Sequence, residues 1–288
     1  MSLKLYARNG KSTQYGLLLL FLLAAWTSRA QTTYYVAGTG SDTNDGRSIA
    51  SPVQSLSRVN GLALQPGDAV LFRRGDTFRG TLLVRQSGTA DKPVLFDAYG
   101  SGNKPVLAGS VPVRNWTKAG VNLWQAPCPA CGNQVTGVYR DGLAQPLGRY
   151  PNADAANRGD LTVLAHVGTN QLTSRQPLTT DWTGGEVVVR PTYWIIDRAP
   201  ITQQAGNTLT INNPSSYNLT DEWSFFIQNH PATLDQTGEW YYNPTTRTLL
   251  IYDDRGDPNG QLITATATDQ VIDIANAAFV SFQNLHVA

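Results

Sequence analysis

The sequence is short of charge and of long apolar segments, and each shortage excludes a class of protein. Charged residues make up 15% of the 288 residues, whereas an average soluble protein has about 25%. Such a chain has no basic stripe for binding nucleic acid. Beyond residue 30 no segment is apolar over the length that crosses a bilayer, about 20 residues. We therefore predict no nucleic-acid partner and no membrane span in the mature chain.

The first thirty residues carry the three-part pattern of a secretory signal. A basic leader without acidic residues precedes an apolar run over residues 17–26, and Ser28-Arg29-Ala30 supplies the small residues that a signal peptidase reads. The pattern predicts cleavage between Ala30 and Gln31. A membrane anchor is the alternative, but the apolar run is shorter than a span requires.

Export also changes the charge balance and the expected compartment. Four of the 22 basic residues and none of the 21 acidic residues lie in residues 1–30, so the mature chain has a net charge of −3 (18 against 21). We expect a secreted, periplasmic or cell-surface protein. With 26 glycines, 16 prolines and 41% hydrophobic residues, its composition indicates an all-β fold with many turns.

Residues 31–68 predict a strand, a loop and a short capping helix. The strand covers residues 33–36, and the loop after it consists almost wholly of turn residues. Ser51-Pro52 is expected to begin the helix, with Ser51 as its N-cap and Pro52 at its first position. The apolar face of this helix would consist of Val53, Leu56 and Val59.

Two patterns of strands share the rest of the chain. Short apolar runs with tight turns occupy residues 69–110 and return in residues 261–288, which favours a stack of strands over long hairpins. Residues 111–260 carry longer segments that are richer in Trp and Tyr, and they predict an inserted antiparallel β-sandwich-like domain. Within it, a hairpin is expected around residues 243–247.

Several of these segments resemble one family. Residues 34–46 resemble the opening of many secreted right-handed parallel β-helix proteins of the pectate-lyase-like and glycoside-hydrolase-like kind, and residues 67–80 and 92–106 look like their first two coils. Arg149-Tyr150-Pro151-Asn152 and residues 234–252 are similar to motifs in the inserted domain of glycoside-hydrolase-like members. The resemblance covers nearly all of residues 33–288. It implies a right-handed parallel β-helix with an insertion and an N-terminal plug.

The resemblance also implies a function, although it does not fix the reaction. We expect an exported carbohydrate-active enzyme, a glycoside hydrolase or a polysaccharide lyase, whose partner is a polysaccharide or oligosaccharide. The alternative is a non-catalytic surface protein that binds glycans or serves as a scaffold, because one fold supports many functions. Solenoid enzymes usually hold substrate along the body of the helix, so we expect the catalytic residues downstream of residue 288 and name none in this chain.

The only two cysteines are Cys128 and Cys131. In an oxidising compartment they would form a local disulfide. A metal site would need two more ligands, and a thioredoxin-like redox role would need a βαβ setting that the surrounding sequence does not predict. The disulfide or an inert pair is the favoured interpretation.

Three further groups of residues carry candidate chemistry. Asp42, Asn44 and Asp45 could bind Ca²⁺ through oxygen ligands, although an ordinary Asx-turn loop is favoured and no other cofactor is predicted. Arg149 and Asn152 could contact carbohydrate, but pairing of Arg149 with a carboxylate is an equal alternative. The acidic cluster at residues 253–257 is interpreted as a solvated turn rather than a catalytic pair. Six tryptophans follow residue 30, and each could stack on a sugar or fill a core: Trp116, Trp124, Trp182, Trp194, Trp223 and Trp240.

The coil pattern returns only just before residue 288, so we expect a truncated chain whose main β-helix lies downstream. Residues 31–288 expressed alone should associate in solution, because the last coil would expose an apolar face and strand edges. Analytical ultracentrifugation tests this expectation. A monodisperse monomer that unfolds cooperatively would contradict it.

Overall fold

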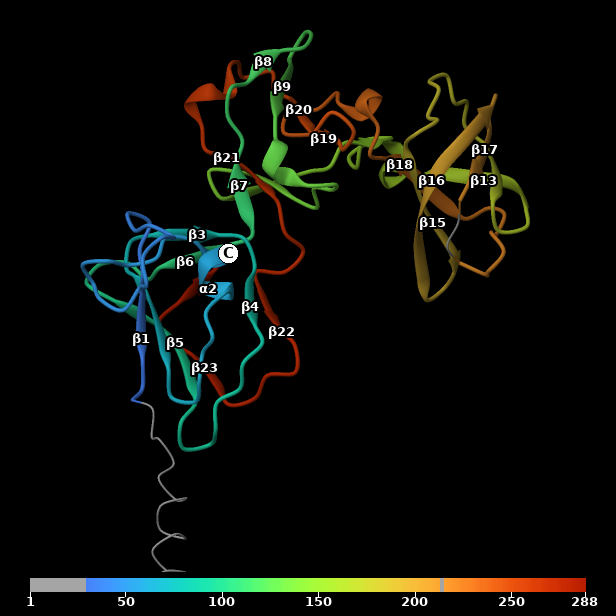
Figure 1. Cartoon of the computed structure of the whole chain (residues 1–288). Coiled ribbons are helices and arrows are strands. Elements are labelled where there is room, and N and C mark those ends of the chain that lie inside the picture. The colour runs from blue at the N-terminus through green and yellow to red at the C-terminus, as the bar shows by residue number, and fades with distance from the viewer. Residues whose placement is uncertain (1–29, 213–214) are drawn as a thin grey trace, which may run out of the picture.

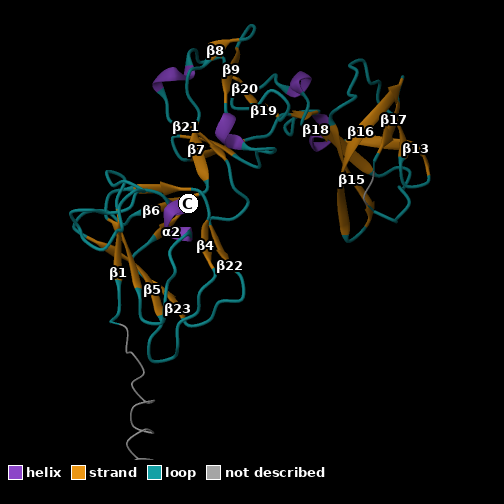
Figure 2. Ribbon diagram, viewed as in Figure 1, coloured by secondary structure: helices purple, strands orange, loops and turns teal. Residues whose placement is uncertain are grey.

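The computed structural model describes residues 30–212 and 215–288. The predicted signal segment lies outside the described residues, apart from Ala30 at its end. Within the described ranges, strands make up nearly all of the regular structure, with one short α-helix, so the all-β prediction is confirmed. No helix in these ranges is long and apolar enough to cross a membrane. Figures 1 and 2 show the strands gathered in three bodies, each with its own hydrophobic cluster.

The first body consists of short parallel sheets. Its sheets have the strand orders β1-β2-β5-β23, β24-β6-β3 and β22-β4, and every pairing is parallel. The strands are β1 (Thr33–Val36), β2 (Ala69–Arg73), β3 (Thr77–Arg79), β4 (Leu82–Val84), β5 (Val94–Tyr99), β6 (Val106–Ala108), β22 (Ile272–Ile274), β23 (Val280–Phe282) and β24 (His286–Val287). The described residues form no closed parallel β-helix.

The chain visits the three sheets of the first body in a fixed order. Strands β2, β3 and β4 add one strand to each sheet, and β5 and β6 then lie beside β2 and β3. The place beside β4 is taken by β22, with Leu82 opposite Ile272. Residues 109–270 are therefore inserted between the second and third strands of one circuit (Figure 1).

The capping helix α2 (Leu56–Asn60) starts later than the sequence suggested. Ser55 is its N-cap, and its hydroxyl accepts a hydrogen bond from the Arg58 backbone N–H at 3.1 Å. Val53 instead forms a parallel β-bridge with Val36, which keeps the backbone extended where Ser51-Pro52 was expected to begin the helix. Leu56 and Val59 are buried as predicted, and burying such side chains stabilises a fold by about 1.5–3 kcal/mol each.

The second body contains two four-stranded antiparallel sheets with a common core. Their strand orders are β11-β10-β21-β7 and β19-β20-β9-β8, and the expected hairpin around residues 243–247 is the β19–β20 connection. The elements are β7 (Ser110–Pro112), β8 (Thr117–Lys118), β9 (Leu123–Pro127), β10 (Val138–Arg140), β11 (Leu143–Gln145), β19 (Trp240–Asn243), β20 (Thr248–Tyr252), β21 (Ile263–Thr266) and the 3₁₀ turns η1 (Pro129–Cys131) and η4 (Pro258–Gly260).

The third body is a closed antiparallel barrel. Six strands follow one another in the order β18-β13-β14-β17-β16-β15, and β15 pairs with β18 to complete the ring, while β12 extends the edge of β18. The elements are β12 (Arg149–Tyr150), β13 (Leu161–Val167), β14 (Gln171–Ser174), β15 (Glu186–Thr192), β16 (Ile195–Ala205), β17 (Thr208–Ile211), β18 (Ser224–Gln228) and the 3₁₀ turns η2 (Ala156–Gly159) and η3 (Pro231–Thr233).

The barrel corrects the prediction of one inserted β-sandwich-like domain in residues 111–260. Residues 161–227 have a hydrophobic cluster of their own, separate from that of the second body. Register shifts interrupt three of the barrel's strand pairs, β13–β14, β15–β16 and β16–β17. Such bulges bend and twist strands, so the sheet can curl until its edges meet. Alternating apolar residues suit a sandwich and a barrel equally, which is why the sequence did not distinguish them.

An ion pair is buried in the second body, where the sequence predicted a solvated turn. The Asp253 side chain is fully buried and pairs with Arg140, whose side chain is 8% exposed. Asp253 also accepts hydrogen bonds from the Arg255 backbone N–H at 3.1 Å and from its side-chain Nε at 2.9 Å. Burial acts to raise the pKa of Asp253, but the bonds from Arg255 and Arg140 outweigh it and lower the pKa. Asp254 and Asp257 are exposed, as expected of a turn.

This ion pair predicts a specific loss of stability in acid. Because the pKa of Asp253 is lowered on folding, its contribution is present above the ordinary value of 3.8 and is lost as the pH falls through the folded value. We expect Asp253→Asn to lower stability at neutral pH by about 3–5 kcal/mol, since Arg140 is left buried without its counter-charge. Below pH 4, the stability of the variant should also depend less steeply on pH than that of the wild type.

Thermal unfolding midpoints measured between pH 2.5 and 7 check this expectation. Asp254→Asn, which changes the exposed neighbouring carboxylate, is the matched control and should follow the wild-type curve. Equal midpoints for Asp253→Asn and wild type at pH 7 would contradict the stabilising role of the pair.

Candidate functional site

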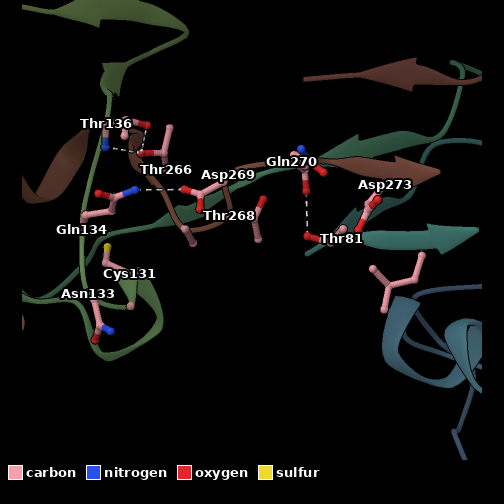
Figure 3. A pocket seen from close by; sticks show the side chains of 13 residues that line it. Thr81, Cys131, Asn133, Gln134, Thr136, Thr266, Thr268, Asp269, Gln270 and Asp273 are labelled. Carbon is pink, nitrogen blue, oxygen red and sulfur yellow. Dashed lines mark hydrogen bonds between the residues drawn. The ribbon is translucent and has the colours of Figure 1, made fainter. Parts of the chain in front are cut away.

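A cleft of about 660 Å³ lies where the first and second bodies meet. Three segments form it: the start of β4, the loop of residues 131–136, and residues 266–273, which connect β21 to β22 (Figure 3). Nine of its 13 lining residues carry a hydroxyl, amide or carboxylate group. The lining residues are Thr81, Leu83, Cys131, Gly132, Asn133, Gln134, Thr136, Thr266, Ala267, Thr268, Asp269, Gln270 and Asp273.

The loop of residues 131–136 is fixed at both ends. Cys128 and Cys131 form a disulfide across the η1 turn, with their Cα atoms 5.4 Å apart. The Tyr242 hydroxyl donates a hydrogen bond to the Gly132 carbonyl at 2.7 Å. At the far end, the Thr136 backbone N–H donates to the Thr266 hydroxyl at 2.8 Å. This wall of the cleft is therefore held in place before any ligand arrives, which reduces the entropy lost on binding.

Two carboxylates reach the cleft, that of Asp269 from the connection between β21 and β22 and that of Asp273 from β22 itself. Asp269 accepts a hydrogen bond from the Gln134 side-chain amide at 3.1 Å, across the cleft wall. Asp273 pairs with Arg85, with 2.6 Å between Oδ2 and the guanidinium nitrogen. Each carboxylate uses one oxygen in these contacts. The other oxygen can accept a hydrogen bond from a ligand hydroxyl.

The floor of the cleft contains a buried polar atom without a partner. Within the described residues, the Thr268 hydroxyl is buried and has no hydrogen-bond partner. It packs against Gly109, where an added Cβ would lie 2.9 Å from Val271 and 3.1 Å from Thr268. Only glycine allows this close approach of the two segments. A cleft lined in this way can bind a ligand that carries many hydroxyl groups.

The calcium candidates are used within their own loop. The Asp42 carboxylate accepts hydrogen bonds from the backbone N–H groups of Gln54 and Ser55, both at 2.9 Å, and from the Ser55 hydroxyl at 2.6 Å. Burial acts to raise the pKa of Asp42, but these bonds outweigh it and lower the pKa. Asn44 donates to the Pro52 carbonyl, and Asp45 accepts from the Arg47 N–H. The loop thus anchors the start of α2. No cluster of three metal-binding side chains occurs among the described residues.

Arg149 is held by protein groups at the base of the barrel. Its guanidinium stacks on the Phe226 ring at 3.8 Å, donates to the Pro151 carbonyl at 3.1 Å and to the Gly159 carbonyl at 2.5 Å, and lies 3.5 Å from the Asp160 carboxylate. Arg149 therefore lies beside a carboxylate, which is the alternative that the sequence left open. These bonds fasten residues 151–160 to β18.

Asn152 lies at the junction between the barrel and the second body. Its side-chain amide donates to Asp235 at 2.8 Å. Nearby, the buried Glu239 carboxylate accepts hydrogen bonds from the backbone N–H groups of Asp235 and Gln236, both at 3.0 Å, and of Arg149 at 3.4 Å. Burial raises the pKa of Glu239 against the opposing effect of these bonds. A carbohydrate contact of Arg149 or Asn152 stays a prediction.

The sequence did not point to the cleft. Its residues come from three segments that are far apart in the chain, and each segment alone reads as ordinary turn or strand-edge sequence. The only available signal was the Thr- and Asp-containing stretch of residues 264–273, next to the expected return of the coil pattern.

Comparisons with known proteins give partial matches. No protein-family model matches the chain. A lacto-N-biosidase from Bifidobacterium longum subsp. longum is 41% identical over 93 residues, which are 30% of this chain and 6% of that enzyme. A solved structure of a glycoside hydrolase matches 89% of this chain and 50% of its own length, with a TM-score of 0.66 and 19% identity. A GH136 lacto-N-biosidase from Eubacterium ramulus is 39% identical over 29% of this chain and 14% of its own, with a TM-score of 0.26.

These matches differ in what they show. The broad structural match shows a shared fold, because its sequence identity is low. The chain spans half of that structure and a small part of the curated lacto-N-biosidase. The curated relative is a lacto-N-biosidase and the structure that shares the fold is a glycoside hydrolase, and these two matches support a carbohydrate-active protein.

Proposed function

We propose that the protein is an exported glycoside hydrolase and that the cleft between its first two bodies binds an oligosaccharide. One observation carries the proposal: hydroxyl, amide and carboxylate groups converge on a single cleft in a chain that is similar to a lacto-N-biosidase and shares the fold of a glycoside hydrolase. Sugar hydroxyls both donate and accept hydrogen bonds, and the free oxygens of Asp269 and Asp273 and the amides of Asn133 and Gln270 match them. Hydrolysis is preferred to lyase chemistry because the curated relative and the structure that shares the fold are both hydrolases.

We also propose that the three parallel sheets are coils of a right-handed parallel β-helix. The fixed order in which the chain visits the sheets supports this assignment. In it, residues 31–68 form the N-terminal strand, loop and cap, residues 69–110 and 261–288 form coils, and residues 111–260 form the insertion. The cleft then lies beside the strand face that starts with β4 and β22, where a solenoid enzyme would extend its substrate groove.

A non-catalytic glycan-binding protein is the second candidate. It is favoured because both cleft carboxylates already contact protein groups: Asp273 is paired with Arg85, and Asp269 with Gln134. A glycosidase usually needs one carboxyl as acid and another as base or nucleophile, about 5–9.5 Å apart. We assign no catalytic pair among the described residues.

Cleavage assays separate these candidates. The purified full-length protein, with whatever sequence follows residue 288, is incubated with an aryl glycoside of lacto-N-biose, chosen from the name of the curated relative, and with a panel of other aryl glycosides. We expect release of the aryl group from at least one of them. Asp269→Asn and Asp273→Asn should raise KM about tenfold, since a hydrogen bond to a charged group contributes about 1.5–3 kcal/mol. Asp254→Asn, outside the cleft, should leave KM unchanged.

Two results would contradict the proposal in different ways. Binding of an oligosaccharide without any cleavage would favour the non-catalytic candidate. Cleavage with an unchanged KM in both cleft variants would place the substrate elsewhere.

Export yields a separate prediction. We propose that residues 1–30 are removed, which leaves Gln31 as the first residue, and the Cys128–Cys131 disulfide is consistent with an oxidising compartment. Mass spectrometry of the protein recovered from outside the cytoplasm should give an N-terminus at Gln31. Recovery of the intact chain with Met1 from the membrane fraction would support the anchor instead.

A further inference from the structure

The tip of the β15–β16 hairpin carries two large aromatic residues on the outside of the barrel. Thr192 pairs with Ile195, so Tyr193 and Trp194 form a two-residue turn. Such turns usually contain glycine, asparagine or aspartate, which suit the backbone geometry. Tyr193 is 80% exposed and Trp194 is 71% exposed. Neither turn geometry nor core packing accounts for aromatic residues at this position.

Each residue of the tip has an aromatic partner from another strand or loop. The rings of Tyr193 and Trp223 lie 5.0 Å apart and are tilted by 60°. The rings of Trp194 and Tyr217 lie 6.1 Å apart, edge to face. Trp223 follows Glu222, whose backbone is in the left-handed region at φ 66°. A non-glycine residue adopts this conformation at a cost, and here it turns the chain so that Trp223 reaches the tip.

A hollow of about 230 Å³ opens between these rings. It is lined by Arg190, Tyr193, Trp223 and Ser224. Among the described residues, the side chains of Arg190 and Ser224 have no hydrogen-bond or ion-pair partner, and the same holds for the Tyr193 hydroxyl and the Trp223 indole N–H. The hollow therefore combines exposed aromatic faces with several unpaired polar groups.

The hollow continues into a longer groove along β15 and β18. A second hollow of about 400 Å³ shares Arg190 and Ser224 with the first and extends to Ile196, Phe226, Arg158 and Asp160. Phe226 is the ring on which Arg149 stacks, so Arg149 supports this groove from outside its lining. The two hollows together offer room for a short chain of ring-shaped units rather than a single small molecule.

We propose that this groove, defined by Arg190, Tyr193, Trp223, Ser224 and Phe226, binds a glycan chain at a site separate from the cleft. A pyranose ring has apolar C–H faces that stack on aromatic rings, and hydroxyl groups at its edge that pair with Arg190 and Ser224. The choice of a glycan rests on the proposed function. An apolar ligand would leave the Arg190 charge without a partner, which is unfavourable.

A protein partner fits this surface less well. A stable protein interface buries about 800 Å² on each side. The exposed aromatic residues here form a small patch next to an ion pair between Arg175 and Glu222 and a hydrogen bond between His166 and Asp221. These side chains already have their partners within the barrel, and a protein interface of that size would have to cover them.

The test begins with a glycan array probed with the purified, labelled mature chain. The best-bound glycan is then titrated against wild type and variants by calorimetry. We expect Tyr193→Ala, Trp223→Ala and Arg190→Gln each to weaken binding about tenfold, since stacking and charged hydrogen bonds carry comparable energies. Trp223→Phe retains a ring and should keep most of the affinity. Phe279→Ala removes an aromatic residue from the first body that is 55% exposed and should bind like wild type.

The outcomes distinguish this proposal from the proposed function. Tyr193 is exposed, so Tyr193→Ala tests the groove even if Trp223→Ala folds poorly. Loss of binding only in Asp269→Asn would place the glycan in the cleft and overturn the groove proposal alone. Absence of any bound glycan, or self-association that Tyr193→Ala abolishes, would also overturn it. Glycan binding that depends on Tyr193, in a protein that cleaves no glycoside, would overturn the proposed hydrolysis and leave the groove standing.

Discussion

The parallel pairing of β22 with β4 is the constraint on which the rest of the structure depends. Neighbouring strands lie about 4.8 Å apart, so residues 109–270 must leave and return at adjacent points. The antiparallel pairing of β7 with β21 meets this condition, with Val111 opposite Ala265. Gly109 sits at the branch: its N–H donates to Ala288 at 2.9 Å and its carbonyl accepts from Ala267 at 2.8 Å. The cleft exists because residues 266–273 run from the paired strands β7 and β21 directly to β22 (Figure 3).

The barrel joins the second body through a different kind of contact. Buried Glu239 satisfies three backbone N–H groups from both sides of the junction, and its raised pKa shows the cost of burying the charge. An apolar residue there would leave those N–H groups unpaired, at about 1–3 kcal/mol each. A buried carboxylate therefore fixes the junction while each body keeps its own core. Closing the barrel also removes the free sheet edges that an open insertion would expose.

Local rules account for what the sequence predicted. Short apolar runs and turns indicated the strands of the first body, and the spacing of the two cysteines indicated a local bond. The start of α2 was missed because a long-range bridge between Val36 and Val53 overrides the Ser-Pro signal. Asp253 was missed for a related reason: its partner Arg140 lies on a distant strand. The cleft and the groove depend on such contacts between remote segments, and no local pattern encodes them.

The two surfaces divide the chemistry of sugar recognition between them. The cleft has hydroxyl and carboxylate groups and no aromatic ring in its lining, so it can select hydroxyl positions but gains little from stacking. The groove has rings and, among the described residues, the unpaired guanidinium of Arg190, so it favours pyranose faces with less selectivity. Either contact alone would be weak. One glycan chain, or neighbouring chains of a polymer, that engaged both would be held far more tightly, because the second contact becomes intramolecular. The barrel stands apart from the first body (Figure 1), and this separation favours extended polymers over short soluble sugars.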